Sequence, residues 1–99
     1  MDGISIRYDY NGNEDEWREA VNTFIDAVND DPDIAGKFHY AVSVAGDGVL
    51  RSHTGRWDSQ ETHATLQSRD YFKTFAGKRT GMAGDSPDAK QITLFRNMS

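Results

Sequence analysis

Apolar and polar residues alternate along four stretches of the chain, and this alternation predicts β-strands. In residues 4–10 every second position is an isoleucine or a tyrosine, and in residues 38–44 every second position is a phenylalanine, tyrosine or valine. The turn formed by residues 46–48 (GDG) follows, so residues 49–57 are predicted to return as the second arm of a hairpin. Residues 92–95 contain Ile92, Leu94 and Phe95 and predict the last strand.

Two further stretches have the spacing of helices. Apolar residues recur every three or four positions between Trp17 and Val28, and Asn13 with the acidic residues after it predicts the start of this helix. A second helix is predicted to begin after Asp58 or Ser59 and to end near Leu66. We expect Ser68 to cap a short helix holding residues 71–75, and the glycine-containing residues 77–90 to form a loop.

The order of these elements is strand, helix, strand, strand, helix, strand. This βαββαβ order predicts a single α+β domain over residues 1–99, with a ferredoxin-like fold and a four-stranded antiparallel sheet. Right-handed crossovers place both helices on one face of the sheet and give the strand order 4-1-3-2.

Composition narrows the classes of partner and cofactor. The chain carries 11 basic and 16 acidic residues, and a net charge of −5 argues against a nucleic-acid partner. It has no cysteine, which excludes disulfides and cysteine-bound zinc or iron–sulfur clusters, and its three histidines lack metal-ligand spacing. We therefore expect no metal and no cofactor. No apolar run approaches the ~20 residues of a membrane span, so we expect no membrane contact and a cytoplasmic location.

The third predicted strand does not have a clean apolar face. Arg51 and His53 share one face with Trp57, so if Trp57 faces the helices the two polar residues do too. Because buried polar groups need partners or water, these three residues predict a cavity between sheet and helices. The alternative is a half-exposed strand whose polar residues are solvated. Within the cavity, His53 is the candidate general base, and Tyr40 and Tyr71 are candidate wall residues with hydroxyl groups.

The segments 55–61 (GRWDSQE) and 66–75 (LQSRDYFKTF) resemble the antibiotic biosynthesis monooxygenase family. That resemblance covers about 20 residues and implies a ferredoxin-like subunit that dimerises through its sheet into a dimeric α+β barrel. It also implies a pocket for a small aromatic or apolar compound, with Trp57 on its wall. Some members of the family oxidise polycyclic phenols to quinones without a cofactor.

The residues expected to form the site follow from the strand pattern and the resemblance together. We assign a catalytic role to His53 and substrate contacts to Trp57, Tyr71, Arg51, Tyr40 and Phe72. Arg51 or Arg79 would steady an anion. Residues 77–84 would form either a mobile lid or an ordinary flexible connection, and the connection is the favoured alternative. The sequence departs from the family at Thr65, where many members have histidine, and at His53, where some quinone-forming members have asparagine. A non-catalytic ligand-binding or interaction protein on the same scaffold is therefore the alternative to a monooxygenase.

Overall fold

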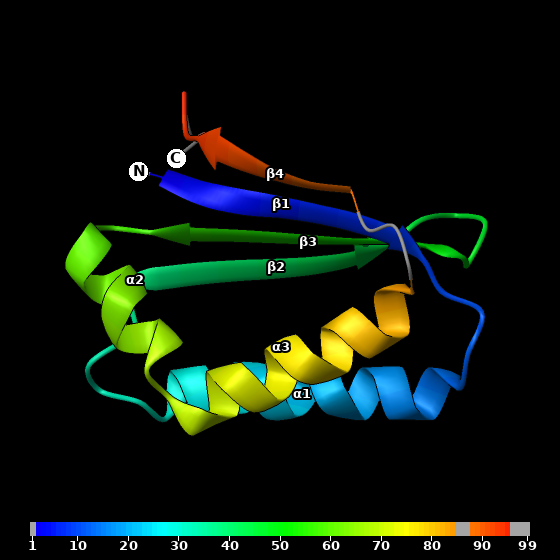
Figure 1. The fold of residues 1–99 in the computed structure, drawn as a ribbon, viewed down its shortest axis with the longest axis horizontal. Helices are drawn as coiled ribbons and strands as arrows, with labels where there is room; N and C mark the ends of the chain where they lie inside the picture. Colours follow the sequence, from blue (N-terminus) through cyan, green and yellow to red (C-terminus); the bar gives the residue numbers. More distant parts are fainter. Residues whose placement is uncertain (1, 85–87, 96–99) are drawn as a thin grey trace.

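The computed structural model describes residues 2–84 and 88–95, which form one sheet and three helices (Figure 1). The elements are β1 (Asp2–Asp9), α1 (Glu14–Asn29), β2 (Phe38–Val44), β3 (Leu50–Trp57), α2 (Gln60–Gln67), α3 (Asp70–Ala83) and β4 (Asp88–Thr93). The predicted α+β class is confirmed, with the second helical region divided into α2 and α3.

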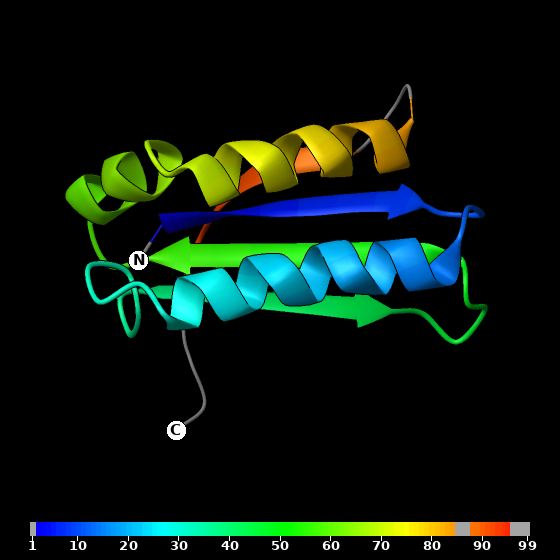
Figure 2. The same cartoon turned by 90° about the horizontal axis from the view of Figure 1, so that it is seen from below.

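The sheet is antiparallel and has the order β2-β3-β1-β4, which is the predicted order read from its other edge. Figures 1 and 2 show that the helices cover one face of this sheet and that α1 and α3 lie side by side. The other face carries no helix in the part of the chain that the structure describes. The ferredoxin-like arrangement therefore leaves one whole sheet face uncovered.

The core lies between the sheet and the helices. Phe24 of α1 is 2% exposed and stacks on Phe75 of α3, with ring centroids 4.3 Å apart. At the start of α1, the side chain of Asn13 accepts a hydrogen bond from the backbone N–H of Glu16, so the predicted cap is confirmed. Ser59 caps α2 in the same way through the N–H of Thr62.

The predicted loop over residues 77–90 is wrong, because α3 continues to Ala83 and β4 already begins at Asp88. Gly77 and Gly81 lie inside the helix, where each costs about 1 kcal/mol relative to alanine. Packing overrides this cost, since Phe72, Phe75 and Met82 contact the core at helical spacing. The helix stops at Gly84, whose φ of 71° suits glycine.

Two consequences follow for the neighbouring segments. The flexible connection or lid expected over residues 77–84 is instead the second half of α3 and its end, so the expectation of a loop there is wrong in either form. Ser68 ends α2 rather than capping α3, whose N-cap Arg69 makes no capping hydrogen bond with its side chain. Residues 85–87 of the predicted loop lie outside the described residues.

The last strand is shifted toward the N-terminus relative to the prediction. Its bounds follow from backbone pairing with β1, which runs from Arg7 opposite Asp88 to Asp2 opposite Thr93. The apolar pattern of residues 92–95 did not reveal this pairing, because the first half of β4 is polar and exposed. Within residues 2–84 and 88–95 no helix has the length and hydropathy needed to cross a membrane.

Candidate functional site

The irregular strand β3 is the structural basis of the site. Its residues alternate strictly between buried and partly buried, and Arg51 and His53 are only 2% and 1% exposed. Both therefore lie on the same helix-facing side as Trp57, and the alternative of a solvated strand is wrong. Two polar side chains in a small core must have partners, and the structure supplies them from β1, α1 and β2.

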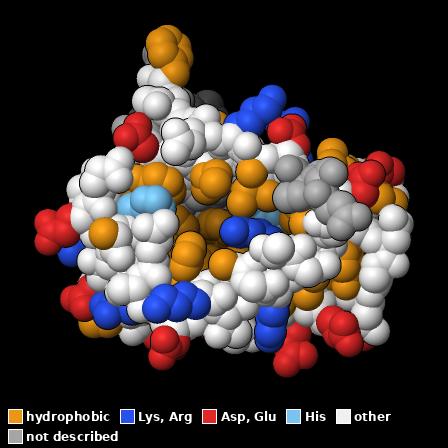
Figure 3. Space-filling model, viewed as in Figure 1, with side chains coloured by type: hydrophobic (Ala, Val, Ile, Leu, Met, Phe, Trp, Pro, Cys, Tyr) orange, Lys and Arg blue, Asp and Glu red, His pale blue; other side chains and the backbone are white. Residues whose placement is uncertain are grey.

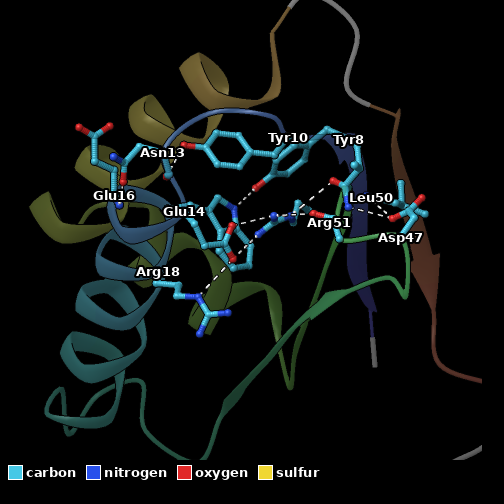
Figure 4. A network of polar contacts seen from close by, with 12 residues as sticks. Tyr8, Tyr10, Asn13, Glu14, Glu16, Arg18, Asp47, Leu50 and Arg51 are labelled. Carbon is cyan, nitrogen blue, oxygen red and sulfur yellow. Dashed lines mark hydrogen bonds and ion pairs between the residues drawn. The ribbon is translucent and has the colours of Figure 1, made fainter.

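Arg51 is held by the start of α1 and by the turn before its own strand (Figure 4). Its guanidinium donates two hydrogen bonds to the carboxylate of Glu14, at 3.1 and 2.8 Å, and one to the carbonyl of Gly48 at 2.9 Å. It also lies 4.3 Å from the ring centroid of Trp17. The ion pair holds the pKa of Glu14 below its usual value. Arg51 thus ties the β2–β3 hairpin to α1 and does not line the cavity described below.

His53 is the centre of a second buried network. Its Nε2 lies 2.7 Å from the hydroxyl oxygen of Tyr8, and its Nδ1 lies 2.7 Å from that of Tyr40. The indole N–H of Trp17 donates to the same Tyr8 hydroxyl at 2.8 Å. Burial, together with the positive charge of Arg79, lowers the pKa of His53 to about 4. His53 is therefore a neutral imidazole at pH 7, with both ring nitrogens already engaged.

A cavity of about 530 Å³ lies beside this network, between the sheet and helices α2 and α3. Figure 3 shows it as a hollow walled by hydrophobic side chains, with a basic side chain and a histidine inside its rim. Of the residues expected at the site, Trp57, Tyr40 and Phe72 line it, whereas Arg51, His53 and Tyr71 do not. The expected cavity is present, but its polar contacts differ from those that the sequence indicated.

Tyr71 points to a different part of the molecule. Its hydroxyl donates to the carboxylate of Asp31 at 2.8 Å, and the guanidinium of Arg69 also contacts that carboxylate at 3.0 Å. Burial and the neighbouring carboxylate raise the pKa of Tyr71 to about 12. This cluster joins the end of α1 to the start of α3 and lies outside the cavity.

His63 is a cavity residue that the sequence analysis did not select. Its ring stacks on Trp57 with centroids 3.7 Å apart and planes 3° from parallel, and burial lowers its pKa. Gln60, His63 and Gln67 all line the cavity, which is the spacing of one helix face. The signal was present in the sequence, since Ser59 fixes where α2 begins and therefore which positions face Trp57.

The other cavity-lining residues with polar groups are Asp2, Tyr40, Trp57, Arg79, Gln91 and Thr93. The indole N–H of Trp57 is buried and has no hydrogen-bond partner among the described residues. Tyr40 presents its hydroxyl, whose pKa burial raises to about 12, and Arg79 lines the same wall. No group of three or more histidine or carboxylate side chains placed to hold a metal ion occurs in the described parts of the chain.

The buried state of His53 predicts a pH dependence of stability. The unfolded chain takes up this proton near pH 6.5 and the folded chain only near pH 4, so acid favours unfolding. The neutral state of His53 therefore contributes its full share to the free energy of unfolding above pH 6.5, and this contribution is lost as the pH falls from 6.5 toward 4. Urea unfolding at pH 7 and pH 4.5 should show a fall of roughly 2 kcal/mol from His53.

His53→Gln removes this titration, so its free energy of unfolding should fall less between the two pH values than that of the wild type. The comparison of the two proteins separates His53 from the carboxylates and from His63, which titrate in both. Equal losses in the two proteins would contradict the assignment.

Comparison with known proteins finds similar structures but no similar sequences. No protein-family model matches the chain, and no curated protein sequence does. Solved structures do match it. One is the structure of a protein from Nitrosomonas europaea described as a putative antibiotic biosynthesis monooxygenase. It matches with a TM-score of 0.75 at 8% identity, over 97% of this chain and 100% of that one.

Two other solved structures show that this fold supports more than one chemistry. A mutant of SnoaB, a cofactor-independent oxygenase from Streptomyces nogalater, matches with a TM-score of 0.72 at 10% identity, over 98% of this chain and 95% of that one. Hydroxynitrile lyase from Passiflora edulis matches with a TM-score of 0.68 at 8% identity, over 100% and 98%. The chain therefore has the fold found in the antibiotic biosynthesis monooxygenases, as the resemblance of residues 55–61 and 66–75 implies.

Proposed function

We propose that this protein binds a small aromatic or apolar compound in the cavity between the sheet and helices α2 and α3. The observation that carries the proposal is the cavity itself, whose volume of about 530 Å³ lies within the range of small-molecule sites. Its walls are largely aromatic and aliphatic, from Phe24, Phe38, Tyr40, Trp57, Leu66 and Phe72.

Two of the polar residues of the cavity are suited to orienting a ligand. Tyr40 and Arg79 line the same wall and carry hydrogen-bond donors for a ligand oxygen. An apolar body with one or two acceptor oxygens satisfies both kinds of surface.

Filling the cavity should abolish binding. Ile4 lines it from β1 and is only partly buried, so Ile4→Trp places a large ring in the ligand space. The test ligand is 2-acetylnaphthalene, an aromatic compound with one acceptor oxygen. We expect its affinity, measured by equilibrium dialysis, to fall about tenfold or more, since even one mismatched methylene in an apolar pocket costs about tenfold.

The matched control is Ile25→Trp, because Ile25 is also partly buried but does not line the cavity. It should bind like the wild type. Unchanged binding by Ile4→Trp, or equal loss in both variants, would place the ligand elsewhere.

A cofactor-independent monooxygenase is the second candidate function, and the position of His63 favours it. Oxidation of a phenol to a quinone begins with removal of the phenolic proton, and the net reaction consumes one O₂ and releases one water. His53 is a poor base for this step, because it is buried, doubly hydrogen-bonded and has a pKa of about 4. His63 is neutral at pH 7, partly exposed and stacked on Trp57 at the cavity wall, so we assign the base to it.

His63→Phe keeps an aromatic ring against Trp57 and removes the basic nitrogen. With a panel of polycyclic phenols, oxygen uptake should fall about 10²–10⁴-fold, the usual effect of losing a general base. Binding of 2-acetylnaphthalene should change little. His39→Phe, on the exposed side of β2, is the control. Full oxygen uptake by His63→Phe would show that His63 is not the base. No uptake by the wild type would rule out the monooxygenase function and leave ligand binding as the proposed function.

We also propose that a second copy of the chain packs on the uncovered face of the sheet. Residues paired directly across the strands share a face. This face carries Ala41, Thr54 and Ile92 among polar and charged residues such as Arg56 and Lys90. Phe95 is 97% exposed and borders a shallow groove there with Leu94, Thr54 and Arg56. Ile92, Leu94 and Phe95 lie together in that groove, and a contiguous exposed apolar patch is typical of an interaction surface.

Analytical ultracentrifugation at micromolar concentration should show a dimer. Phe95→Asp puts a charge into the contact and should raise the dimer dissociation constant about tenfold or more. Val44→Asp is the control, since Val44 is also exposed but shares the helix-facing side of the sheet with Arg51. A monomeric wild type, or equal weakening by both variants, would contradict the proposed interface.

A further inference from the structure

A chain of hydrogen-bonding side chains runs from α1 through the core to the cavity. It begins at the indole N–H of Trp17, passes through the Tyr8 hydroxyl and the ring of His53, and ends at the Tyr40 hydroxyl. The three links measure 2.8, 2.7 and 2.7 Å. Only Tyr40, the last member, lines the cavity.

The direction of this chain follows from counting protons. An indole N–H only donates, so the Tyr8 oxygen accepts from Trp17 and keeps one proton of its own to give. Among the described residues, the only acceptor that Tyr8 contacts is Nε2 of His53. If Tyr8 donates there, the neutral imidazole carries its proton on Nδ1 and donates it to the Tyr40 oxygen.

The reverse direction leaves a buried group without a partner. If Tyr40 donated to Nδ1, the imidazole proton would sit on Nε2 and point at Tyr8. The Tyr8 oxygen would then accept from both Trp17 and His53, and its own proton would have no acceptor among the described residues. Tyr8 is only 4% exposed, so an orphaned proton there is costly.

We propose that His53 is a positioning residue that holds the Tyr40 hydroxyl as a hydrogen-bond donor into the cavity, where it recognises an acceptor oxygen on the aromatic ligand. The inference rests on the proposed binding function and narrows its ligand class. Because the Tyr40 oxygen accepts a hydrogen bond from Nδ1–H of His53, the hydroxyl proton of Tyr40 is free to point at the ligand. Arg79 lines the same wall, and its charge acts on both Tyr40 and His53, so this end of the cavity suits a carbonyl or phenolate oxygen.

The protonation pattern is testable without any ligand. Long-range ¹H–¹⁵N correlation spectra of the histidine side chains distinguish the Nδ1–H tautomer from the Nε2–H tautomer. His53→Gln, which lacks these signals, identifies them among those of His39 and His63. We expect a single Nδ1–H tautomer for His53 at pH 7. An Nε2–H tautomer would overturn the proposal.

The ligand class is tested with two compounds of similar shape, 2-acetylnaphthalene and 2-isopropylnaphthalene, of which only the ketone has an acceptor oxygen. Tyr40→Phe should shift the ratio of their dissociation constants about fivefold toward the hydrocarbon, the usual effect of one neutral hydrogen bond. Tyr71→Phe is the matched control, since its hydroxyl bonds Asp31 outside the cavity, and should leave the ratio unchanged.

An unchanged ratio in Tyr40→Phe would overturn the donor role even if both compounds bind. Binding of neither compound to the wild type would overturn the proposed function and the ligand class together. The tautomer of His53 distinguishes these failures, because it reports the direction of the chain in the protein alone.

Discussion

Burying an arginine and a histidine on the core face of β3 is the constraint on which the rest of this small core depends. Each polar group removed from water must find a partner, and a core of this size has few to offer. Glu14 at the start of α1 and the carbonyl of Gly48 satisfy Arg51, while Tyr8 and Tyr40 satisfy His53. The position of α1 on the sheet is thus determined by polar pairing as well as by apolar packing.

The two ends of β3 face different surroundings on the helix-covered side of the sheet. At the Arg51 end, the guanidinium of Arg51 lies between the sheet and α1, against Glu14 and the ring of Trp17. Toward Trp57 the strand carries Gly55, where an added Cβ would lie 3.2 Å from ring atoms of both Phe38 and Tyr40. The missing side chain leaves room for those rings, and beyond them the cavity opens. Tyr40 touches both parts, since it binds His53 and lines the cavity.

The fold is shared by solved structures of an oxygenase and of a lyase at 8–10% identity, so the arrangement of strands and helices does not select a reaction. The choice of reaction must depend on the side chains that line the cavity. In this chain they are a histidine stacked on a tryptophan at one wall and a tyrosine with an arginine at another. We propose that this combination selects an aromatic ligand with an acceptor oxygen.

The sequence by itself determined the element order, the strand order and the shared face of Arg51, His53 and Trp57, because these follow from local periodicity and chain connectivity. It failed where distant contacts override local preference. Packing carries α3 through Gly77 and Gly81, and pairing with β1 starts β4 at Asp88. Only the tertiary structure decided that His53 does not line the cavity, because its hydrogen bond to Tyr8, 45 positions away, is absent from any local pattern.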